Sequence, residues 1–395
     1  MNQPLQAAKF ALVAVAVVFV WQFCHVRFNY GGEWNALFLS GERFDVPPAL
    51  AAEKIPQLPD SDGYDGQFYH YIAHDPLMSK GLARYVDDPG LRWRRVLVPG
   101  LAAVLSAGHP DWVDTAYILV IYAFIGAGVY WLSLLAMRFQ GHPAWGLCFV
   151  LIPATAISVE RMTVDVAVTA LTVGYAYYAL NSRSGATWFV LALAPLARET
   201  GLALLAVHAA YSLAARRWRE LAATIVCVLP FLAWAIYVAA TTSPSAASWL
   251  SLPFFGLITR SIDVLPLPVT GSQALVAMLL DYAGIVGVWI ALVQSVTLLW
   301  PRLRPALVAR SQAMGPLEWG VAFFALSAVM VGSPKVWAGS YAFARVLSPW
   351  LVFLLLVAIR DRRYWFALPC VLMGLHVAAQ AAVHLVGIFR HVLNA

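Results

Sequence analysis

The amino-acid sequence predicts an all-α polytopic membrane protein with about eleven transmembrane helices and a long first extracytoplasmic loop that carries interfacial helices. Of its 395 residues, 61% are hydrophobic and only 12% are charged. A soluble domain carries about 25% charged residues, so this chain lacks the charge to cover a water-facing surface. Most of the exterior is therefore expected to face lipid.

The apolar residues gather into runs near the length of about 20 residues that a helix needs to cross a bilayer. Lys9 and the run after it resemble a signal peptide, but no small-x-small cleavage site follows, so this run is expected to remain as the first span. Arg198 and Glu199 interrupt one pair of runs. The predicted spans lie near residues 8–25, 113–137, 143–159, 164–181, 185–197, 200–215, 220–241, 272–300, 317–333, 346–360 and 364–388.

Basic residues indicate the orientation of these spans. With the N-terminus inside, the cytoplasmic segments hold twelve basic residues against only Glu220, Glu318 and Asp361. The positive-inside rule therefore predicts a cytoplasmic N-terminus and an external C-terminus. The basic residues are Lys9, Arg138, Arg183, Arg216, Arg217, Arg219, Arg302, Arg304, Arg310, Arg360, Arg362 and Arg363.

This threading leaves two large outer loops, at residues 26–112 and 242–271. In the first loop, the apolar part of the stretch 92–108 spans about 14 residues, which is too short to cross and fits a helix lying in the interface. Arg95, at the start of this stretch, is a candidate substrate ligand. No internal repeat is visible, so we predict a single domain over residues 1–395.

The charge pattern argues against nucleic-acid binding, and the cysteines argue against a cysteine metal site. The net charge of +6 comes from short basic clusters between apolar runs. That pattern is typical of topology signals and argues against nucleic-acid binding. The cysteines lie in or beside apolar segments without metal-binding spacing, so we expect buried hydrophobic residues at Cys24, Cys148, Cys227 and Cys370.

The densest group of reactive side chains lies at residues 59–76 of the first loop. Asp60, Asp62 and Asp65 are candidate catalytic groups, and Gly63 permits a tight backbone on which carboxylates converge. Aromatic rings beside carboxylates are a usual way to hold a sugar. The alternative interpretation is an ordinary Asp-Gly turn. Candidate substrate ligands in the same segment are Tyr64, Gln67, Tyr69 and His70.

Metal binding is left open by these residues. His70 and His74 have i, i+4 spacing, but the sequence shows no HExxH motif and no obvious third ligand, so no metal site is predicted from them. The aspartates would suit Mg²⁺ or Mn²⁺, which bind through oxygen. A divalent cation is therefore a possible cofactor, and no cofactor is certain.

Two more polar groups lie at the ends of apolar runs. Glu160 and Asp165, between the third and fourth spans, are candidate substrate ligands. The alternatives are an ion pair of Glu160 with Arg161 and, for Asp165, a favourable acid at a helix N-terminus. Arg198 and Glu199 lie between two short runs. Because a charge at the bilayer centre costs about 2.5–3.5 kcal/mol, they need a polar cavity or an outer-interface position. Arg198 is predicted to bind phosphate, and a satisfied Arg198–Glu199 pair is the alternative.

Lys335 and Arg345 are basic residues predicted to lie outside, against the positive-inside trend. An anionic headgroup or a pyrophosphate-like leaving group would explain them, since arginine suits bidentate phosphate contact. The alternative is a snorkelling anchor at the interface.

These features resemble the GT-C superfamily of membrane glycosyltransferases, which includes protein O-mannosyltransferases, aminoarabinose lipid A transferases and GPI mannosyltransferases. Residues 64–69 are similar to the Asp-containing first-loop motif of that group, and residues 94–99 sit where it places a Pro-bearing interfacial helix. Asp165 matches a common second acid. Residues 198–200 look like a Lys/Arg-Glu-Thr element, and residues 345–349 resemble a late arginine segment that contacts lipid phosphate.

The resemblance implies a polyprenyl-phosphate sugar donor whose phosphate is held by Arg345 and Arg198. A carboxylate, most simply Asp65, would take the proton of an acceptor hydroxyl in an inverting displacement. The acceptor is a lipid, a glycan or a protein. Because Asp60, Asp62 and Asp65 are spaced apart rather than paired, the base among them stays open. The implied location is the bacterial inner membrane, with the active site on the periplasmic side.

Two other classes of function remain as alternatives. A transporter or flippase of lipid-linked sugars would share the many spans and buried charges, but the inverted repeats common in transporters are not visible. A non-catalytic membrane assembly partner would not need acids and arginines gathered at one membrane face.

Overall fold

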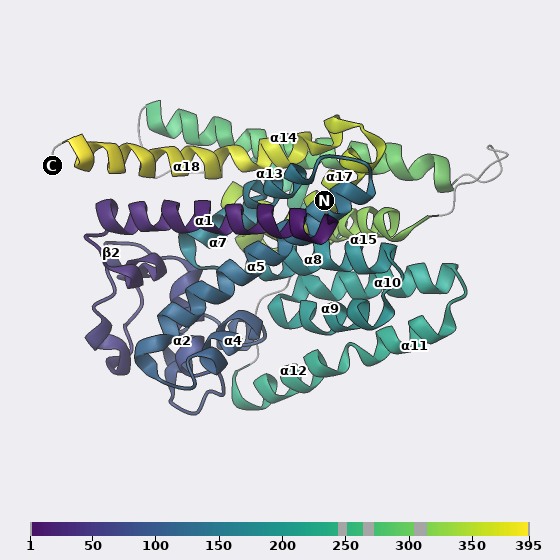
Figure 1. Ribbon diagram of the computed structural model, residues 1–395. Helices are drawn as coiled ribbons and strands as arrows, with labels where there is room; N and C mark the ends of the chain where they lie inside the picture. The colour runs from purple at the N-terminus through teal and green to yellow at the C-terminus, as the bar shows by residue number, and fades with distance from the viewer. Residues whose placement is uncertain (1, 244–250, 264–271, 304–313, 394–395) are drawn as a thin grey trace.

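The computed structural model describes residues 2–243, 251–263, 272–303 and 314–393. Helices form almost all of its regular structure (Figure 1). The strands of the described residues, β1 (Ser40–Gly41) and β2 (Gln57–Leu58), pair in parallel within the first loop. The predicted all-α class is confirmed.

Within the described residues, six stretches are long and apolar enough to cross a membrane, and there are seven if a bent pair of helices is counted as one span. These lengths indicate a polytopic membrane protein. The bent pair is α6 (Cys148–Leu151), extended at its start by a 3₁₀ turn from Pro143, and α7 (Pro153–Arg161), which meet at 57°. The six stretches are α1 (Gln3–Asn29), α5 (Pro110–Arg138), α11 with α12 (Trp218–Val226 and Leu229–Thr241), α14 (Ser272–Leu303), α17 (Ser340–Asp361) and the stretch Tyr364–Leu393 that contains α18 (Leu368–Leu393).

The eleven predicted spans are not confirmed. Four of the predicted segments form helices of only 13 to 16 residues in the structure. Polar residues at the helix ends shorten them, since Asp165 begins one helix and Arg198 separates two others. The four helices are α8 (Asp165–Leu180), α9 (Ser184–Ala197), α10 (Leu202–Ala214) and α15 (Pro316–Met330).

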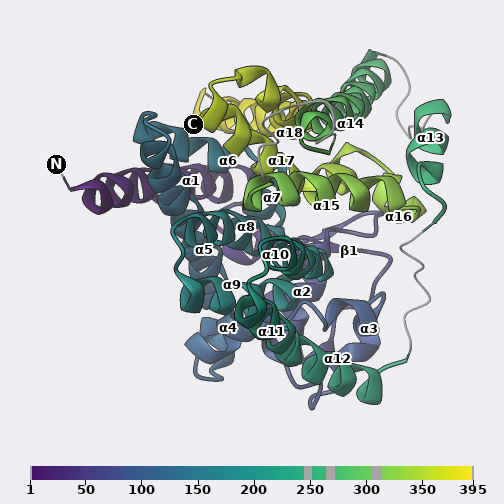
Figure 2. The ribbon, with the colours of Figure 1, turned by 90° about the vertical axis from the view of Figure 1, so that its right-hand side faces the viewer.

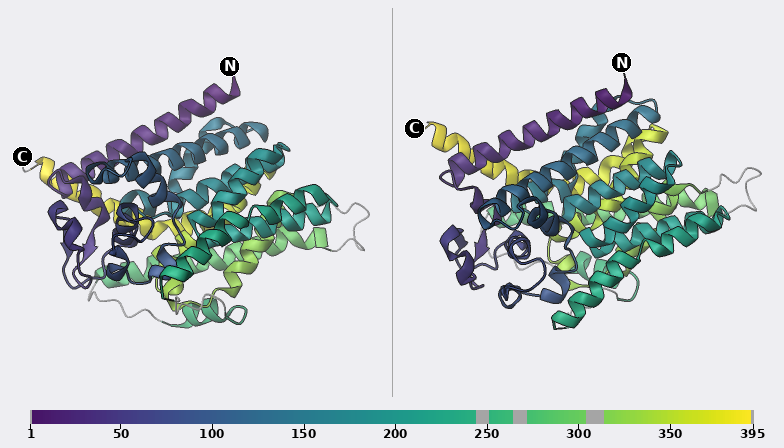
Figure 3. Two further views of the ribbon diagram at one scale, coloured as in Figure 1. Left: turned by 90° about the horizontal axis from the view of Figure 1, so that it is seen from below. Right: turned by 60° about the horizontal axis from the view of Figure 1, so that its bottom comes forward.

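The helices run side by side, and α17 lies at their centre (Figures 1 and 2). Its most apolar stretch is 89% buried, against 22% for that of α1, so α17 faces protein where α1 largely faces outward. Helices α7, α8, α14, α15 and α18 pack around it. The first loop covers the end of the bundle at which α18 finishes, while α1 begins toward the other end (Figure 3).

The first loop spans residues 30–109, slightly shorter than predicted, and contains three helices. The predicted interfacial stretch forms α4 (Leu97–Leu105), whose nine residues are too few to cross a bilayer. Trp93 is fully buried and donates its indole N–H to the carbonyl of Asp75 at 3.2 Å. The backbone carbonyl of Trp93 accepts from the indole N–H of Trp234, on α12, at 2.7 Å, and this contact attaches the loop to the bundle. The other helices are α2 (Asp65–His74) and α3 (Pro89–Arg92).

The predicted second outer loop is described only in part, because residues 244–250 and 264–271 lie outside the described ranges. Within it, α13 (Phe255–Ile262) carries Arg260, which pairs with Asp281 of α14. This buried ion pair attaches α13 to the bundle.

Helix breaks place polar residues at the end of the bundle that carries the first loop. Ile152 precedes Pro153, whose ring favours extended backbone in the residue before it, and α6 ends there. Met162 has a φ of +47° and ends α7, so that Asp165 can begin α8. Arg198 has extended backbone and separates α9 from α10.

Gly66 sets how closely α2 approaches α7. A Cβ atom at this position would lie 2.2 Å from the carbonyl oxygen of Arg161, which is a backbone atom. Because backbone cannot rotate away as a flexible side chain can, only glycine fits without movement of α2. This contact fixes the start of α2 against the end of α7.

We expect Gly66→Ala to destabilise the protein by about 1–3 kcal/mol, the usual range for overpacking. The measurement is thermal unfolding in detergent. Gly185→Ala is the matched control, because a Cβ there meets no atom within 4 Å and alanine favours the helix. Equal unfolding temperatures for Gly66→Ala and Gly185→Ala would contradict the close approach of α2 to α7.

Candidate active site between the first loop and α17

Asp65 is the first residue of α2 and is held between two arginines. Arg92, from α3, donates to Asp65 Oδ1 at 2.9 Å, and Arg345, from α17, pairs with Oδ2. Burial raises the pKa of the Asp65 carboxyl, but the charges of Arg345 and Arg92 outweigh it and hold that pKa well below its ordinary value. Asp65 is therefore a carboxylate at neutral pH.

Arg92 and Arg345 differ in how many of their guanidinium N–H groups have partners within the protein. Arg92 also binds Asp87 at 2.9 Å, and its guanidinium lies 4.9 Å from the ring centre of Phe68. Arg345 is more exposed, and its Nε atom has no hydrogen-bond partner among the described residues. Its second ionic contact, with Asp165, is long at 3.9 Å. Arg345 thus keeps capacity to bind an anionic ligand.

Asp165 and Arg198 form a buried ion pair behind Arg345. The Asp165 side chain is fully buried and that of Arg198 is 4% exposed. The predicted alternative, a pair between Arg198 and Glu199, is not what forms. Glu199 instead accepts from Arg95 at 3.0 Å. Arg345 connects this pair to Asp65, so the first loop and the predicted arginines meet at one place.

Arg95 and Tyr69 form the inner edge of the site. Arg95 donates to the hydroxyl of Tyr69 at 2.8 Å, and both side chains are buried. Burial raises the pKa of Tyr69, but the charges of Arg95 and Arg92 outweigh it, so the net pKa lies below its ordinary value. Together with the contact of Arg95 and Glu199, this hydrogen bond joins α2, the turn before α10 and the segment before α4.

A polar pocket of about 150 Å³ opens beside Asp65 and Arg345. The guanidinium of Arg161 lies between the rings of Tyr64 and Tyr341, 4.0 Å and 3.9 Å from their centres. The pocket therefore combines a carboxylate, two guanidinium groups and two aromatic rings. Its lining is Gly63, Tyr64, Asp65, Ile157, Arg161, Thr163, Tyr341, Ala342 and Arg345.

Sequence reasoning did not select Arg161, Tyr341 or Arg92 as site residues. Arg161 follows Glu160 in the sequence, and Tyr341 lies between Lys335 and Arg345. No spacing in the sequence shows that the end of α7 meets the start of α17. Arg92 begins the basic run of the interfacial stretch, and this run was the available signal.

Other predicted residues lie outside the pocket. Asp60 and Asp62 are exposed and pair with Arg43 at 2.8 Å and 3.6 Å, so the three aspartates do not converge. Gln67 accepts from the Ser40 hydroxyl at 2.9 Å and donates to the carbonyl of Asp62 at 2.7 Å. It fixes the loop around the pocket rather than lining it.

Glu160 and Lys335 are also placed apart from the pocket lining. Glu160 lines an apolar groove of about 380 Å³ between α1, α7 and α18. Its Oε1 atom lies 3.8 Å from Nδ1 of His384. Lys335 is exposed on the short helix α16 (Pro334–Trp337).

A second polar cluster surrounds His70. Its Nε2 lies 2.8 Å from Asp114 Oδ1, 3.1 Å from Glu53 Oε2 and 3.2 Å from His74 Nε2. Burial lowers the pKa of His70, but the charges of Asp114 and Glu53 raise it to about 9. The sequence offered no third ligand for the histidine pair, and the structure brings two carboxylates to it.

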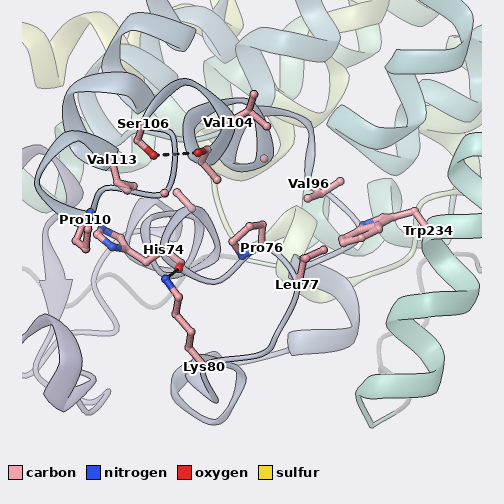
Figure 4. Close-up of a pocket in the computed structure, with 14 residues that line it drawn as sticks. His74, Pro76, Leu77, Lys80, Val96, Val104, Ser106, Pro110, Val113 and Trp234 are labelled. Atoms are coloured by element: carbon pink, nitrogen blue, oxygen red, sulfur yellow. Dashed lines mark hydrogen bonds between the residues drawn. The ribbon is translucent and has the colours of Figure 1, made fainter.

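A cavity of about 440 Å³ lies beside this cluster and is lined mainly by apolar side chains (Figure 4). His74, Leu77 and Trp234 contribute to its wall, and Lys80 donates to the carbonyl of His74 at 2.7 Å. Its wall contains no carboxylate among the described residues. The smaller pocket at Asp65, in contrast, is lined by a carboxylate and two guanidinium groups.

No family model matches the chain, and neither the curated proteins nor the solved structures include a match to it. The function is therefore inferred from the geometry and charge of the site. The strongest element of that geometry is the contact between Asp65 and Arg345.

We expect Asp65→Asn to lower the free energy of unfolding by about 3 kcal/mol at neutral pH, because it leaves the buried Arg92 and the partly buried Arg345 less compensated. The folded pKa of Asp65 is depressed, so its stabilisation is present above about pH 4 and is lost as the pH falls further. The difference in stability between wild type and Asp65→Asn, followed as the difference in Tm, should therefore be constant at pH 6–8 and become smaller below about pH 4.

Asp62→Asn is the matched control for this titration. Its side chain is 71% exposed, so its ion pair contributes at most about 1 kcal/mol. A difference between wild type and Asp65→Asn that stays unchanged down to about pH 3 would contradict the ionic role of Asp65.

Proposed function

We propose that the protein transfers a sugar from a polyprenyl-phosphate donor to an acceptor hydroxyl at the extracytoplasmic face. The observation that carries this proposal is the contact of Asp65 with Arg345 in the wall of a small polar pocket. A carboxylate can accept the hydroxyl proton, and a guanidinium can bind the departing phosphate. Both groups stand where the first loop meets the helix bundle.

The pocket suits a sugar phosphate in charge and shape. Arg345 and Arg161 supply two positive charges for the phosphate. Tyr64 and Tyr341 offer ring faces beside them, and such faces are suited to packing against a sugar. The lipid tail would extend into the surrounding bilayer.

The proposed reaction is a single displacement at the anomeric carbon. The acceptor oxygen forms a bond to this carbon while the bond from the carbon to the phosphate oxygen breaks. Asp65 takes the hydroxyl proton. The electron pair of the broken bond leaves with the phosphate, whose charge Arg345 and Arg161 stabilise.

The arginine pairing of Asp65 explains how the base would be activated. Asp65 is a weak base while both arginines hold it, because they favour its ionised form. A donor phosphate competes for Arg345 and weakens that hold. Binding of the donor would thereby raise the pKa of Asp65 and make it a better proton acceptor.

The remaining residues are assigned positioning roles. Asp165 and Arg198 support Arg345 from behind, while Arg95, Glu199 and Tyr69 fix α2. Asp60 and Asp62 are excluded as the base in this scheme because they are exposed and bound to Arg43. Since the three aspartates do not converge, the scheme assigns them no Mg²⁺ or Mn²⁺.

For the membrane arrangement, we propose that the four short helices cross together with the seven candidate stretches, which makes eleven spans. Short spans are accommodated by local thinning or by flanking residues that reach the interface. An odd number puts the two termini on opposite sides of the membrane. The positive-inside rule then favours a cytoplasmic N-terminus and an external first loop. In a bacterial inner membrane the site would face the periplasm.

Cysteine labelling tests this arrangement. We expect Glu33→Cys, in the first loop, to react with a membrane-impermeant maleimide in intact spheroplasts, and Arg219→Cys, at the start of α11, to react only after permeabilisation. Both positions are exposed. Wild type, with its four native cysteines, gives the background. Labelling of both variants from the same side would contradict the eleven-span topology.

The transfer reaction is tested with purified protein and radiolabelled polyprenyl-phosphate sugars presented with candidate acceptors. We expect Asp65→Asn to lower the rate by about 10²–10⁴-fold, the usual contribution of a general base. Arg345→Lys should raise KM for the donor, because lysine lacks the bidentate fork. Asp60→Asn and Asp62→Asn should retain near-wild-type rates.

Two outcomes separate the proposal from its alternatives. Movement of labelled lipid across vesicles without transfer of the sugar would indicate a transporter or flippase. Absence of both activities, in protein that melts normally, would favour a non-catalytic assembly partner. Undiminished transfer by Asp65→Asn would remove Asp65 from the base role.

A further inference from the structure

The cluster around His70 brings four potential metal ligands together from three separate segments. Glu53 ends a 3₁₀ helix (Pro48–Glu53), His70 and His74 lie on α2, and Asp114 lies near the start of α5. One ligand atom from each of the four residues lies within 4.8 Å of the others. Among the described residues, no other group of histidine, cysteine or acidic side chains converges in this way.

Hydrogen bonding does not account for this convergence. Three atoms lie 2.8 to 3.2 Å from His70 Nε2, and a single N–H can point at only one of them. Glu53 Oε2 and Asp114 Oδ1 are buried atoms without a hydrogen-bond partner among the described residues. A cation at the centre would satisfy all of these lone pairs together.

The separations from His70 Nε2 are close to those between the ligands of tetrahedral zinc. Four ligands at about 2.0–2.1 Å from a zinc ion lie about 3.3 Å from one another. The contacts of His70 Nε2 lie near this value, and His74 Nε2 is 3.5 Å from Glu53 Oε1 and 3.9 Å from Asp114 Oδ1. Two imidazoles favour zinc over Mg²⁺ and Ca²⁺, which prefer oxygen ligands.

We infer that Glu53, His70, His74 and Asp114 form a structural zinc site that fastens the first loop to α5. The set of four protein ligands fills a tetrahedral shell, as in structural rather than catalytic zinc sites. The ion would join segments that are far apart in the sequence and would fix α2 between them. This inference does not depend on sugar transfer.

Metal binding by the full-length chain tests the site. The protein is purified through a tag without histidine, stripped with a chelator and titrated with Zn²⁺. We expect one zinc per chain by mass spectrometry and a rise in Tm on binding. Glu53→Gln and Asp114→Asn, each altering a partly exposed side chain, should weaken binding by about tenfold or more.

His109→Ala is the matched control, because His109 is exposed at the start of α5 and is not part of the cluster. It should bind zinc like wild type. Co²⁺ in the wild-type site should show the intense visible absorption of tetrahedral coordination, and both carboxylate variants should lose it. Wild type without bound zinc, variants with unchanged affinity, or an equal Tm rise with Mg²⁺ would overturn the inference.

Discussion

The contact between Asp65 and Arg345 is the interaction on which the rest of the site depends. A carboxylate and a guanidinium removed from bulk water are tolerated only when their charges meet. Arg345 belongs to α17, whose apolar stretch is the most buried of the six long candidate spans in the described residues, and Asp65 belongs to the first loop. The charge pair therefore fixes the loop on the bundle, and the close approach at Gly66 follows from that position.

Breaks in the helices supply the polar backbone and side chains that this site needs. In a bilayer, irregular backbone is tolerated where it is buried in protein or lines a polar cavity. The breaks near Met162 and Arg198 both meet this condition, because Asp165 and Arg198 pair with each other. Helices that stop early for this reason are shorter than a bilayer needs, which is why the length of α8 does not identify it as a span.

The sequence predicted the helical class and the long apolar helices well, because hydrophobic runs near 20 residues are a strong signal. It also predicted the meeting of Asp65, Arg198 and Arg345, since charges among apolar runs have to find one another. It did not predict that Asp60 and Asp62 would be exposed, because a run of spaced acids does not reveal which of them faces an arginine. Contacts between segments far apart in the sequence determine which aspartate faces the arginines of the site.

The ligands of the proposed zinc site could also be predicted from the sequence only in part. Helical spacing paired His70 with His74, but Glu53 and Asp114 reach them only through folding of the whole loop. His70 and His74 lie about 7.5 Å and 13.5 Å along α2 from Asp65, at 1.5 Å per residue. An ion held by both histidines would therefore lie beyond direct contact with a phosphate at Arg345. It could act on the pocket only by fixing α2, so the proposed anchor and the proposed reaction lie at different positions along one short helix.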